Sequence, residues 1–343
     1  MEHIGMTAII MGLAVFVILT GAAYSVWAER KVSAWMQQRV GPNRVGPFGL
    51  IQPAVDAIKL ILKEDIIPAG ADKFLHFLAP VMATTLAVLN IAMLPFAKDV
   101  HVFDANIGVL FVLGVSSIAV YGITLAGWAS NSKYALLGGL RSSAQMISYE
   151  LSMGLSVVSV VLLCNHFSPS GTEYLRLQSI VEAQRNVWFV LINPVACLIF
   201  IVCAFAETNR TPFDLVEAEQ ELVGGFHTEY SGMKFGAFFV GEYMNVIIMS
   251  AMITTLFFGG YLVPFEGLLG LTEENLGGMV YTIMGITSFS IKTVFFIFVF
   301  LWVRWTLPRF KYNQLMDLGW KRFIPISLAN LILLGLVLTL LNA

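Results

Sequence analysis

The chain has 343 residues, of which 57% are hydrophobic and only 12% are charged, and its net charge at neutral pH is -2. This composition lies far outside the usual balance of a soluble domain, and it gives no reason to expect nucleic acid as a partner, because the 20 basic residues are scattered along the chain. The three cysteines form no Cys-x-x-Cys pair, so the sequence offers neither a disulfide framework nor a ligand set for a metal or an iron–sulfur cluster. Any redox centre must therefore lie in another protein.

Eight apolar runs are long enough to cross a hydrocarbon core of about 30 Å, which takes roughly 20 helical residues. They lie at about 4–28, 76–96, 106–128, 143–163, 188–206, 238–262, 279–303 and 323–341. The first run is too long for the core of a signal peptide and is followed by Glu29-Arg30-Lys31, so we interpret it as a retained helix. The sequence predicts an all-α integral membrane protein with eight transmembrane helices, forming a single membrane domain over residues 1–343.

The positions of lysine and arginine predict the orientation. Loops 29–75, 129–142, 207–237 and 304–322 contain 16 of the 20 basic residues, whereas the opposite side contains only Lys98, Arg176 and Arg185. We therefore expect both termini in the periplasm or its equivalent, and the four basic loops on the cytoplasmic or matrix side, where soluble partners dock.

The first inner loop contains a short helix that we expect to lie flat on the membrane surface. Two Gly-Pro pairs around Arg44 fix several backbone dihedral angles ahead of it. Over residues 50–63, polar side chains recur at helical spacing next to a parallel apolar stripe. This length cannot span a bilayer but suits the interface. The segment fits either a simple basic anchor or a wall around an entry for an amphiphile.

The third inner loop, residues 207–237, is acidic. Six carboxylates fall within 23 residues and are balanced by one arginine, Arg210; they are Glu207, Asp214, Glu217, Glu219, Glu221 and Glu229. Thr211-Pro212-Phe213-Asp214 predicts a helix start, and Gly224-Gly225 predicts its end. The loop is either an ordinary solvated face or a partly buried cluster, in which mutual repulsion raises and couples the pKa values of the carboxyl groups.

Three ionisable residues interrupt the apolar spans, namely Glu150, Glu242 and Lys292. Each costs a few kcal/mol inside a membrane unless it is paired, neutral or facing water, so a functional role is the default hypothesis and a structural pair is the alternative. With the predicted orientation, Glu29, Glu150, Glu207 and Glu242 lie in the inner half of the membrane or at its edge, and Lys292 lies near the midplane. A proton path from the acidic loop to mid-membrane is the resulting hypothesis.

Four long segments of the chain resemble one known family, the H-subunit family of NADH-quinone oxidoreductase, which includes subunit 1 of mitochondrial complex I. The segments are ERK…QRVGPNRVGPFGLIQPAVDAIKLILKE, AQMISYE, AETNRTPFDLVEAEQELVGGFHTEYSG and RWTLPRFKYNQLMDLGWKRFIPISL. The resemblance covers nearly the whole chain, with the motifs in the family's order. It implies an eight-helix subunit that joins the electron-transfer arm of the complex to the proton-pumping membrane arm.

The resemblance also implies roles for particular residues. Arg30, Arg39 and Phe226 match segments that line the family's quinone chamber. The proton-coupling residues that it implies are Glu29, Glu150, Glu207, Asp214, Glu217, Glu219, Glu221, Glu229, Glu242 and Lys292. The implied substrate is ubiquinone or menaquinone, with iron–sulfur clusters and FMN in partner subunits. The implied partners are the soluble quinone-site and iron–sulfur subunits, the antiporter-like subunits of the membrane arm, and the lipid bilayer.

The expected function is to form the quinone-access chamber and to couple quinone reduction to proton translocation. The alternatives are a homologous subunit of a membrane-bound hydrogenase or formate-linked complex, a stand-alone proton or cation transporter, and a passive anchor. A transporter predicts titratable groups on both sides of the midplane and usually repeat symmetry, which the sequence lacks. The expected location is a bacterial plasma membrane, with the mitochondrial inner membrane as the alternative.

Overall fold

The computed structural model describes residues 2–342 except 169–171, 215–223, 265 and 267–276. In this part of the chain the structure is helical and contains no strand, only an isolated β-bridge between Ala97 and Val100. The longer helices are α1 (Glu2–Met36), α3 (Lys73–Ile91), α4 (Gly108–Ala129), α5 (Lys133–Phe167), α8 (Pro194–Glu207), α10 (Gly232–Phe257), α13 (Gly278–Thr306) and α15 (Ile324–Asn342). The shorter ones are α2 (Gln52–Leu62), α6 (Leu177–Ala183), α7 (Phe189–Ile192), α14 (Tyr312–Asp317) and the turns η1 (Pro47–Gly49), η2 (Gly225–His227) and η3 (Leu318–Phe323).

Seven helical segments in the described residues are long and apolar enough to span a membrane, which confirms an all-helical integral membrane protein. The remaining predicted span, at 188–206, corresponds to α7 and α8, and α8 has only 14 residues. The break lies at Asn193-Pro194, because proline cannot donate a backbone hydrogen bond but suits the first position of a new helix. The Asn193 side chain accepts a hydrogen bond from the Ala196 amide at 3.0 Å and caps that new helix.

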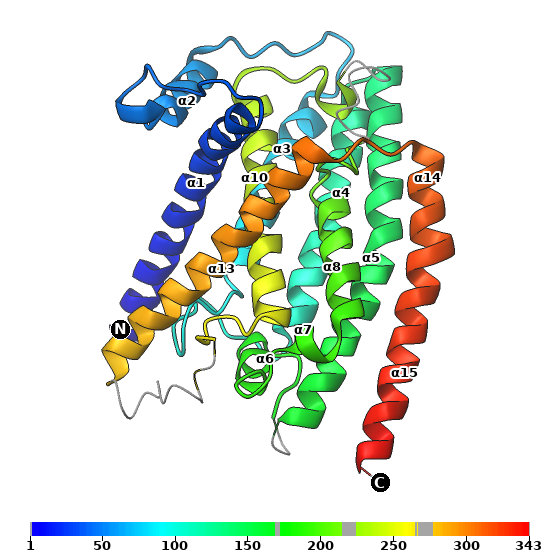
Figure 1. The fold of residues 1–343 in the computed structure, drawn as a ribbon. Coiled ribbons are helices and arrows are strands. Elements are labelled where there is room, and N and C mark those ends of the chain that lie inside the picture. Colours follow the sequence, from blue (N-terminus) through cyan, green and yellow to red (C-terminus); the bar gives the residue numbers. More distant parts are fainter. Residues whose placement is uncertain (1, 169–171, 215–223, 265, 267–276, 343) are drawn as a thin grey trace.

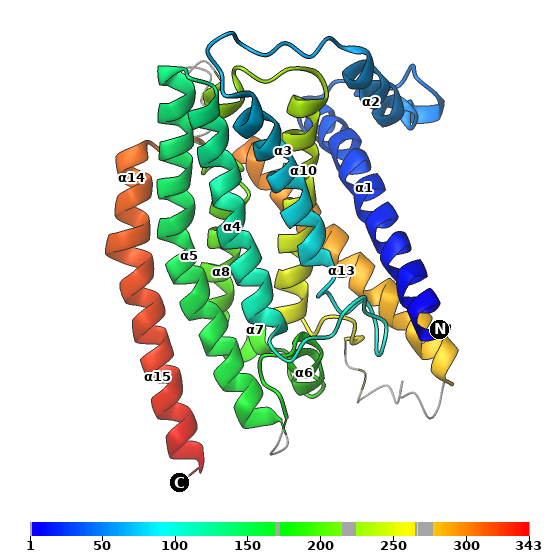
Figure 2. The same ribbon diagram turned by 180° about the vertical axis from the view of Figure 1, so that it is seen from behind.

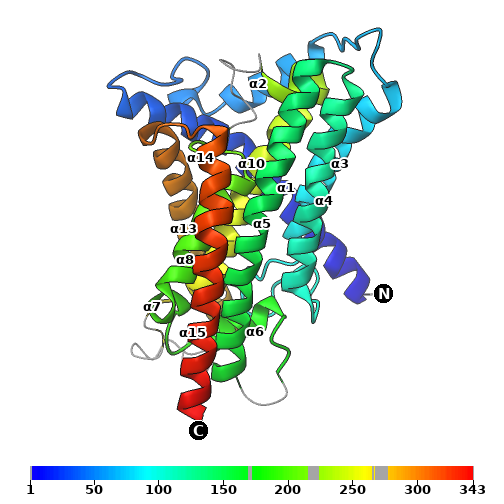
Figure 3. The same ribbon diagram turned by 90° about the vertical axis from the view of Figure 1, so that its right-hand side faces the viewer.

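The helices form one bundle with α5, α8 and α10 at its centre (Figure 1). Helices α1 and α13 slant across one side of it, while α3 and α4 lie against the opposite face (Figure 2). The last helix, α15, stands at the edge and contacts α5 and α8 (Figure 3). The main core lies where α5, α8 and α10 pack, and Phe200, Met244 and Ile248 are among its buried side chains.

Both chain ends lie at the same end of the bundle, opposite α2, as expected for eight crossings (Figure 1). At the other end, α2 lies outside the outline of the bundle, next to the end of α1, and none of its residues is buried. Its bounds, Gln52–Leu62, agree with the predicted interfacial segment at 50–63.

The sequence predicts that a new helix begins at Thr211. In the structure, no helix begins at that residue. Residues 208–214 form turns instead, with the Phe213 amide donating to the Arg210 carbonyl at 2.8 Å. Segment 215–223, which holds Glu217, Glu219 and Glu221, lies outside the described residues. The chain returns at Gly224 and Gly225, where φ values of 135° and 67° suit glycine because it lacks a Cβ atom.

Candidate functional site

A cluster of charged residues lies inside the bundle where α1, α10, α13 and the chain after α8 meet. Arg210, which is 4% exposed, is at its centre and pairs with Glu29 (Nη1 to Oε2, 3.4 Å) and with Glu242 (Nε to Oε1, 2.9 Å). Arg304 pairs with the other oxygen of Glu29 at 2.9 Å, and the Tyr243 hydroxyl donates to Glu29 Oε2 at 2.8 Å. We call these five residues the charged cluster; its two arginines and two glutamates balance, as buried charges require.

Local structure fixes the position of Arg210. Its backbone amide donates to the Phe205 carbonyl at 3.2 Å, so the chain turns tightly at the end of α8. The guanidinium carbon lies 4.2 Å from the centre of the Tyr243 ring, a favourable cation–π distance. Glu242 and Tyr243 are consecutive on α10 and contact Arg210 by a carboxylate and a ring face. The turn and the helix therefore hold the guanidinium from two sides.

An apolar groove of about 420 Å³ lies between α1, α10 and α13. Its walls are Ala14, Val17, Ile18, Gly21, Tyr24, Ser25, Trp27, Ala28, Ile91, Leu94, Phe96, Ile247, Ala251, Phe289, Ser290, Thr293, Val294 and Ile297. Two of them, Ser25 and Ile297, also line a small cavity of about 10 Å³ whose other walls include Glu29, Arg210, Tyr243 and Arg304. The apolar groove therefore ends at the charged cluster.

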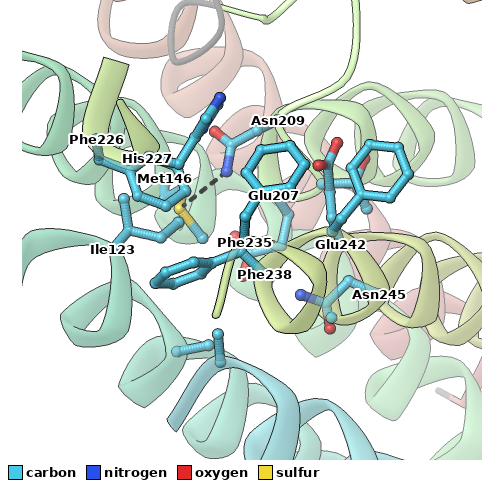
Figure 4. A pocket seen from close by; sticks show the side chains of 15 residues that line it. Ile123, Met146, Glu207, Asn209, Phe226, His227, Phe235, Phe238, Glu242 and Asn245 are labelled. Carbon is cyan, nitrogen blue, oxygen red and sulfur yellow. Dashed lines mark hydrogen bonds between the residues drawn. The ribbon is translucent and has the colours of Figure 1, made fainter. Parts of the chain in front are cut away.

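A second cavity, of about 60 Å³, lies among α4, α5, α8, α10 and the turn η2 (Figure 4). Of the charged cluster, only Glu242 lines it. We call it the polar cavity, because six polar residues line it alongside apolar ones; they are Glu207, Thr208, Asn209, His227, Glu242 and Asn245. It has room for a few water molecules, since one needs about 10–15 Å³, but not for a quinone ring. Glu242 thus faces the polar cavity while its carboxylate pairs with Arg210.

Glu207 is 5% exposed at the end of α8, and its Oε2 atom has no hydrogen-bond partner among the residues that the structure describes. Glu150 lies on α5, which packs against α8. Glu150 in turn accepts a hydrogen bond from the Ser117 hydroxyl on α4. The structure therefore places Glu242 and Glu207 on the polar cavity, and Glu150 outside its lining on the neighbouring helix α5.

The described ends of the acidic loop are buried rather than solvated. Asp214 is 3% exposed and its Oδ2 atom lies 2.9 Å from Arg309 Nη2. At the other end, His76 stacks on Tyr230 with ring centres 4.0 Å apart, and its Nε2 atom lies 3.4 Å from the carbonyl oxygen of Glu229. Burial raises the pKa of Tyr230 above its ordinary value. Both ends of the loop are thus anchored in the bundle.

The three residues matched to a quinone chamber do not lie together. The side chain of Arg30 is 46% exposed and pairs with Asp56 of α2 at 2.7 Å, while Arg39 Nε donates to Gln37 at 2.6 Å. Phe226 is 8% exposed and lines the polar cavity instead of the apolar groove. Arg30 therefore ties α1 to the flat helix, and Phe226 closes the polar cavity.

Lys292 lies apart from the carboxylates of Glu29 and Glu242 in the charged cluster. Its ammonium donates to the carbonyl oxygens of Phe258 (2.8 Å), Gly260 (3.0 Å) and Leu262 (2.6 Å), just past the end of α10. The Nζ atom also lies 4.7 Å from the centre of the Trp188 ring. Phe258 is 16 residues after Glu242, which corresponds to roughly 24 Å along a helix. The structure thus places Lys292 as a cap on α10, outside the group around Arg210.

Comparison with known proteins decides the family. The family model for NADH dehydrogenase matches residues 8–335. The NADH-quinone oxidoreductase subunit 8 of Rhodothermus marinus is 57% identical, with 96% of each chain covered. The H subunit of the Salinibacter ruber enzyme is 54% identical over 98% of this chain and 97% of its own, and an H subunit of Geobacter sulfurreducens is 53% identical over 96% and 95%. The chain belongs to the H-subunit family of NADH-quinone oxidoreductase.

It is therefore a subunit of that enzyme complex. Cys164, Cys197 and Cys203 are buried and unpaired, and the described residues contain no group of histidine, cysteine and acidic side chains able to hold a metal ion. Membership of the family favours NADH-quinone oxidoreductase over a hydrogenase or formate-linked complex and over a stand-alone transporter. The passive anchor remains the alternative for this subunit.

Several residues of this site did not emerge from the sequence. In the sequence analysis, Arg304 contributed only to the count of basic residues in the inner loops. Tyr243 and Asn245 were not identified, although a polar residue next to Glu242 inside an apolar span indicates a functional site. On the side of the chain termini, the structure also buries Glu266, which pairs with Arg185 at 3.2 Å and accepts from Tyr281 at 3.0 Å. Because Glu266 lies between the predicted spans, the search for charges inside those spans did not include it.

Proposed function

We propose that this subunit binds the quinone along the apolar groove and passes the electrostatic effect of quinone reduction from the charged cluster to the carboxylates around the polar cavity. The observation that carries the proposal is the double pairing of Arg210. One partner, Glu29, lines the small cavity at the end of the apolar groove, and the other, Glu242, lines the polar cavity.

The apolar groove has the shape and chemistry of a site for an isoprenoid tail. Its α1 wall runs from Ala14 to Ala28, which is roughly 21 Å of helix. Ligand sites are typically apolar with a few polar groups at one end, and here those groups belong to the charged cluster. The tail lies in the groove with its ring directed toward Glu29, Tyr243 and Arg304, next to the soluble partner that delivers electrons.

The coupling step follows from the chemistry of the charged cluster. Reduction of a quinone to a quinol consumes two protons and two electrons, so charge near Glu29 changes while the reaction proceeds. Because Arg210 is shared, a stronger interaction with Glu29 weakens its interaction with Glu242, and Glu242 then holds a proton more readily. Glu242, Glu207 and Glu150 transmit this change along the polar cavity. The acidic-loop residues Asp214, Glu217, Glu219, Glu221 and Glu229 supply protons to it from the inner surface.

The remaining assignments complete the proposal. Arg30 and Arg39 border the inner mouth of the quinone chamber, Phe226 closes the polar cavity, and Lys292 links the outer end of α10 to the hydrophilic axis of the membrane arm.

The quinone, ubiquinone or menaquinone, is the substrate, and FMN and iron–sulfur clusters are held by partner subunits. The soluble quinone-site and iron–sulfur subunits dock at the α2 end, antiporter-like subunits pack in the membrane, and the location is the bacterial inner membrane with both termini periplasmic.

A photoreactive quinone tests the groove directly. A quinone analogue with a photoactivatable group on its tail is added to the assembled complex in membranes, and labelled peptides of this subunit are identified by mass spectrometry. We expect labelling of α1 and α13 at the groove, around Val17 and Val294, that excess natural quinone suppresses. Labelling confined to other subunits, or to lipid-facing helices such as α15, would contradict the assignment.

A further inference from the structure

We propose that Asn245 is a positioning residue that orders water in the polar cavity, so that Glu207 exchanges protons with Glu242. This inference rests on the proposed function of these two glutamates. Nothing in the sequence motifs or in the comparisons assigns a role to Asn245. It lies on α10 three residues after Glu242, and both residues line the polar cavity (Figure 4).

The carboxyl group of Glu207 has an unmet demand for a hydrogen bond. The residue is 5% exposed and lines the polar cavity, but its Oε2 atom has no partner among the described residues. Burying a carboxyl group without a hydrogen bond is unfavourable, and buried polar groups in proteins are almost always satisfied by protein or by ordered water. The polar cavity, at about 60 Å³, is large enough for that water.

The two polar residues that follow Glu207, Thr208 and Asn209, already make hydrogen bonds within the protein. The Thr208 hydroxyl donates to the carbonyl oxygen of Ala204 at 2.9 Å. The Asn209 amide donates to the sulfur of Met146 at 3.6 Å, and its oxygen accepts from Ser142 and Gln145 at 3.3 and 3.4 Å. Asn209 therefore holds the α8 turn onto α5, and the hydroxyl donor of Thr208 is already used within α8.

Asn245 differs from these neighbours. Its side chain makes no hydrogen bond to any residue in the described part of the chain, although it lines the same cavity. An amide supplies two donors and an acceptor, so it can hold a water molecule that in turn donates to one carboxylate and accepts from a protonated one. Glu242 is held by Arg210 at 2.9 Å and cannot move toward Glu207 without breaking that pair. A water chain ordered by Asn245 connects the two carboxyl groups without that movement.

The test compares three substitutions in the assembled complex reconstituted in liposomes. Asn245→Leu removes both hydrogen-bonding functions at similar volume, Asn245→Ser keeps a hydroxyl and leaves room for one more water, and Ile123→Leu reshapes the same cavity without changing a polar atom. NADH:quinone turnover and proton flux are measured in H₂O and in D₂O. We expect Asn245→Leu to lower both rates by at least about tenfold, since a positioned proton transfer contributes a factor of about 10²–10⁴.

The solvent isotope effect separates positioning from packing. We expect it to rise in Asn245→Leu, because proton transfer becomes rate-limiting, and to return toward its original value in Asn245→Ser. Equal losses in Asn245→Leu and Ile123→Leu, or an unchanged isotope effect, would overturn the inference. A fourth variant, Glu207→Gln, distinguishes a failure of the role of Asn245 from a failure of the proposed function of Glu207. If that variant is impaired and Asn245→Leu is not, only the role of Asn245 fails; if Glu207→Gln is fully active, the proposed function of Glu207 fails as well.

Discussion

Arg210 contacts Glu242 through a 2.9 Å ion pair, although 31 residues and a whole loop separate them in the sequence. The same guanidinium also contacts Glu29, so one side chain connects the end of the apolar groove with the polar cavity. A single buried cation shared by two carboxylates makes their protonation interdependent.

Removing the shared cation tests how much the cluster contributes to stability. Arg210→Gln leaves Glu29 and Glu242 buried with less positive charge, and breaking a buried pair in this way costs about 3–5 kcal/mol. We expect a lower unfolding temperature of the purified complex, measured by differential scanning calorimetry. The control is Lys321→Gln, which breaks the 2.8 Å pair with Asp317 at the surface, where both side chains are well exposed. Equal thermal stability of the two variants would contradict the view that Arg210 is a buried structural link.

Narrowing the apolar groove tests the assignment of the tail. Val294→Trp adds bulk at a groove wall that is 62% exposed, so the fold accommodates it. We expect KM for a long-tailed quinone to rise more than that for a short-tailed analogue, with kcat for the short one nearly unchanged. Val280→Trp, at a 53% exposed site of the same helix outside the groove, is the matched control. A rise of KM that is independent of tail length would argue against the groove.

A glycine on α5 fixes the wall of the polar cavity. A Cβ atom at Gly138 would lie 2.8 Å from the Cα atom of Gly225 in the turn η2, so Gly138→Ala must displace the turn that carries Phe226 and His227. We expect a loss of about 1–3 kcal/mol of stability and a lower turnover. Gly154→Ala on the same helix meets nothing within 4 Å and is expected to be neutral or slightly stabilising, because alanine favours helix. Thermal inactivation of the two variants side by side decides between these outcomes.

The buried end of the acidic loop predicts an alkaline pH dependence. Burial raises the pKa of Tyr230 above its ordinary value of 10.0. The folded protein then keeps the phenol proton more tightly than the unfolded chain does, so this contribution is fully present below about pH 10 and is lost as the pH rises further. Tyr230→Phe is expected to flatten the fall in stability above that pH, whereas Tyr134→Phe, at a 58% exposed ring, is not. Thermal inactivation between pH 8 and 11 measures both; identical slopes would show that the folded protein does not hold the Tyr230 proton more tightly than the unfolded chain does.

The sequence predicts the helical spans well, because a run of about 20 apolar residues has few alternatives in a bilayer. It also predicts the flat helix at 50–63, which the structure forms over Gln52–Leu62. The break at Asn193-Pro194 was missed because the hydrophobicity of residues 188–206 is continuous there, although proline is a visible signal.

The pairing of charges could not be predicted from the sequence. Glu29 meets Arg210 across 181 residues, because α1 packs against α10 and Glu242 and Tyr243 of α10 hold Arg210. The sequence places Glu150, Glu242 and Lys292 inside apolar spans. The depth of a residue in a span does not determine which neighbours its side chain faces. Lys292 illustrates this, since its partners are backbone carbonyl groups that have no sequence signature.

The most direct test of the central claim is the activity of Glu242→Gln in the complex reconstituted in liposomes. Electron entry is monitored with an acceptor that takes electrons before the quinone site, alongside NADH:quinone turnover and proton flux. We predict that electron entry stays intact while quinone reduction and proton flux fall together, because Arg210 loses the carboxylate that links the charged cluster to the polar cavity. Full quinone turnover with full proton flux in this variant would contradict the proposed coupling through Arg210.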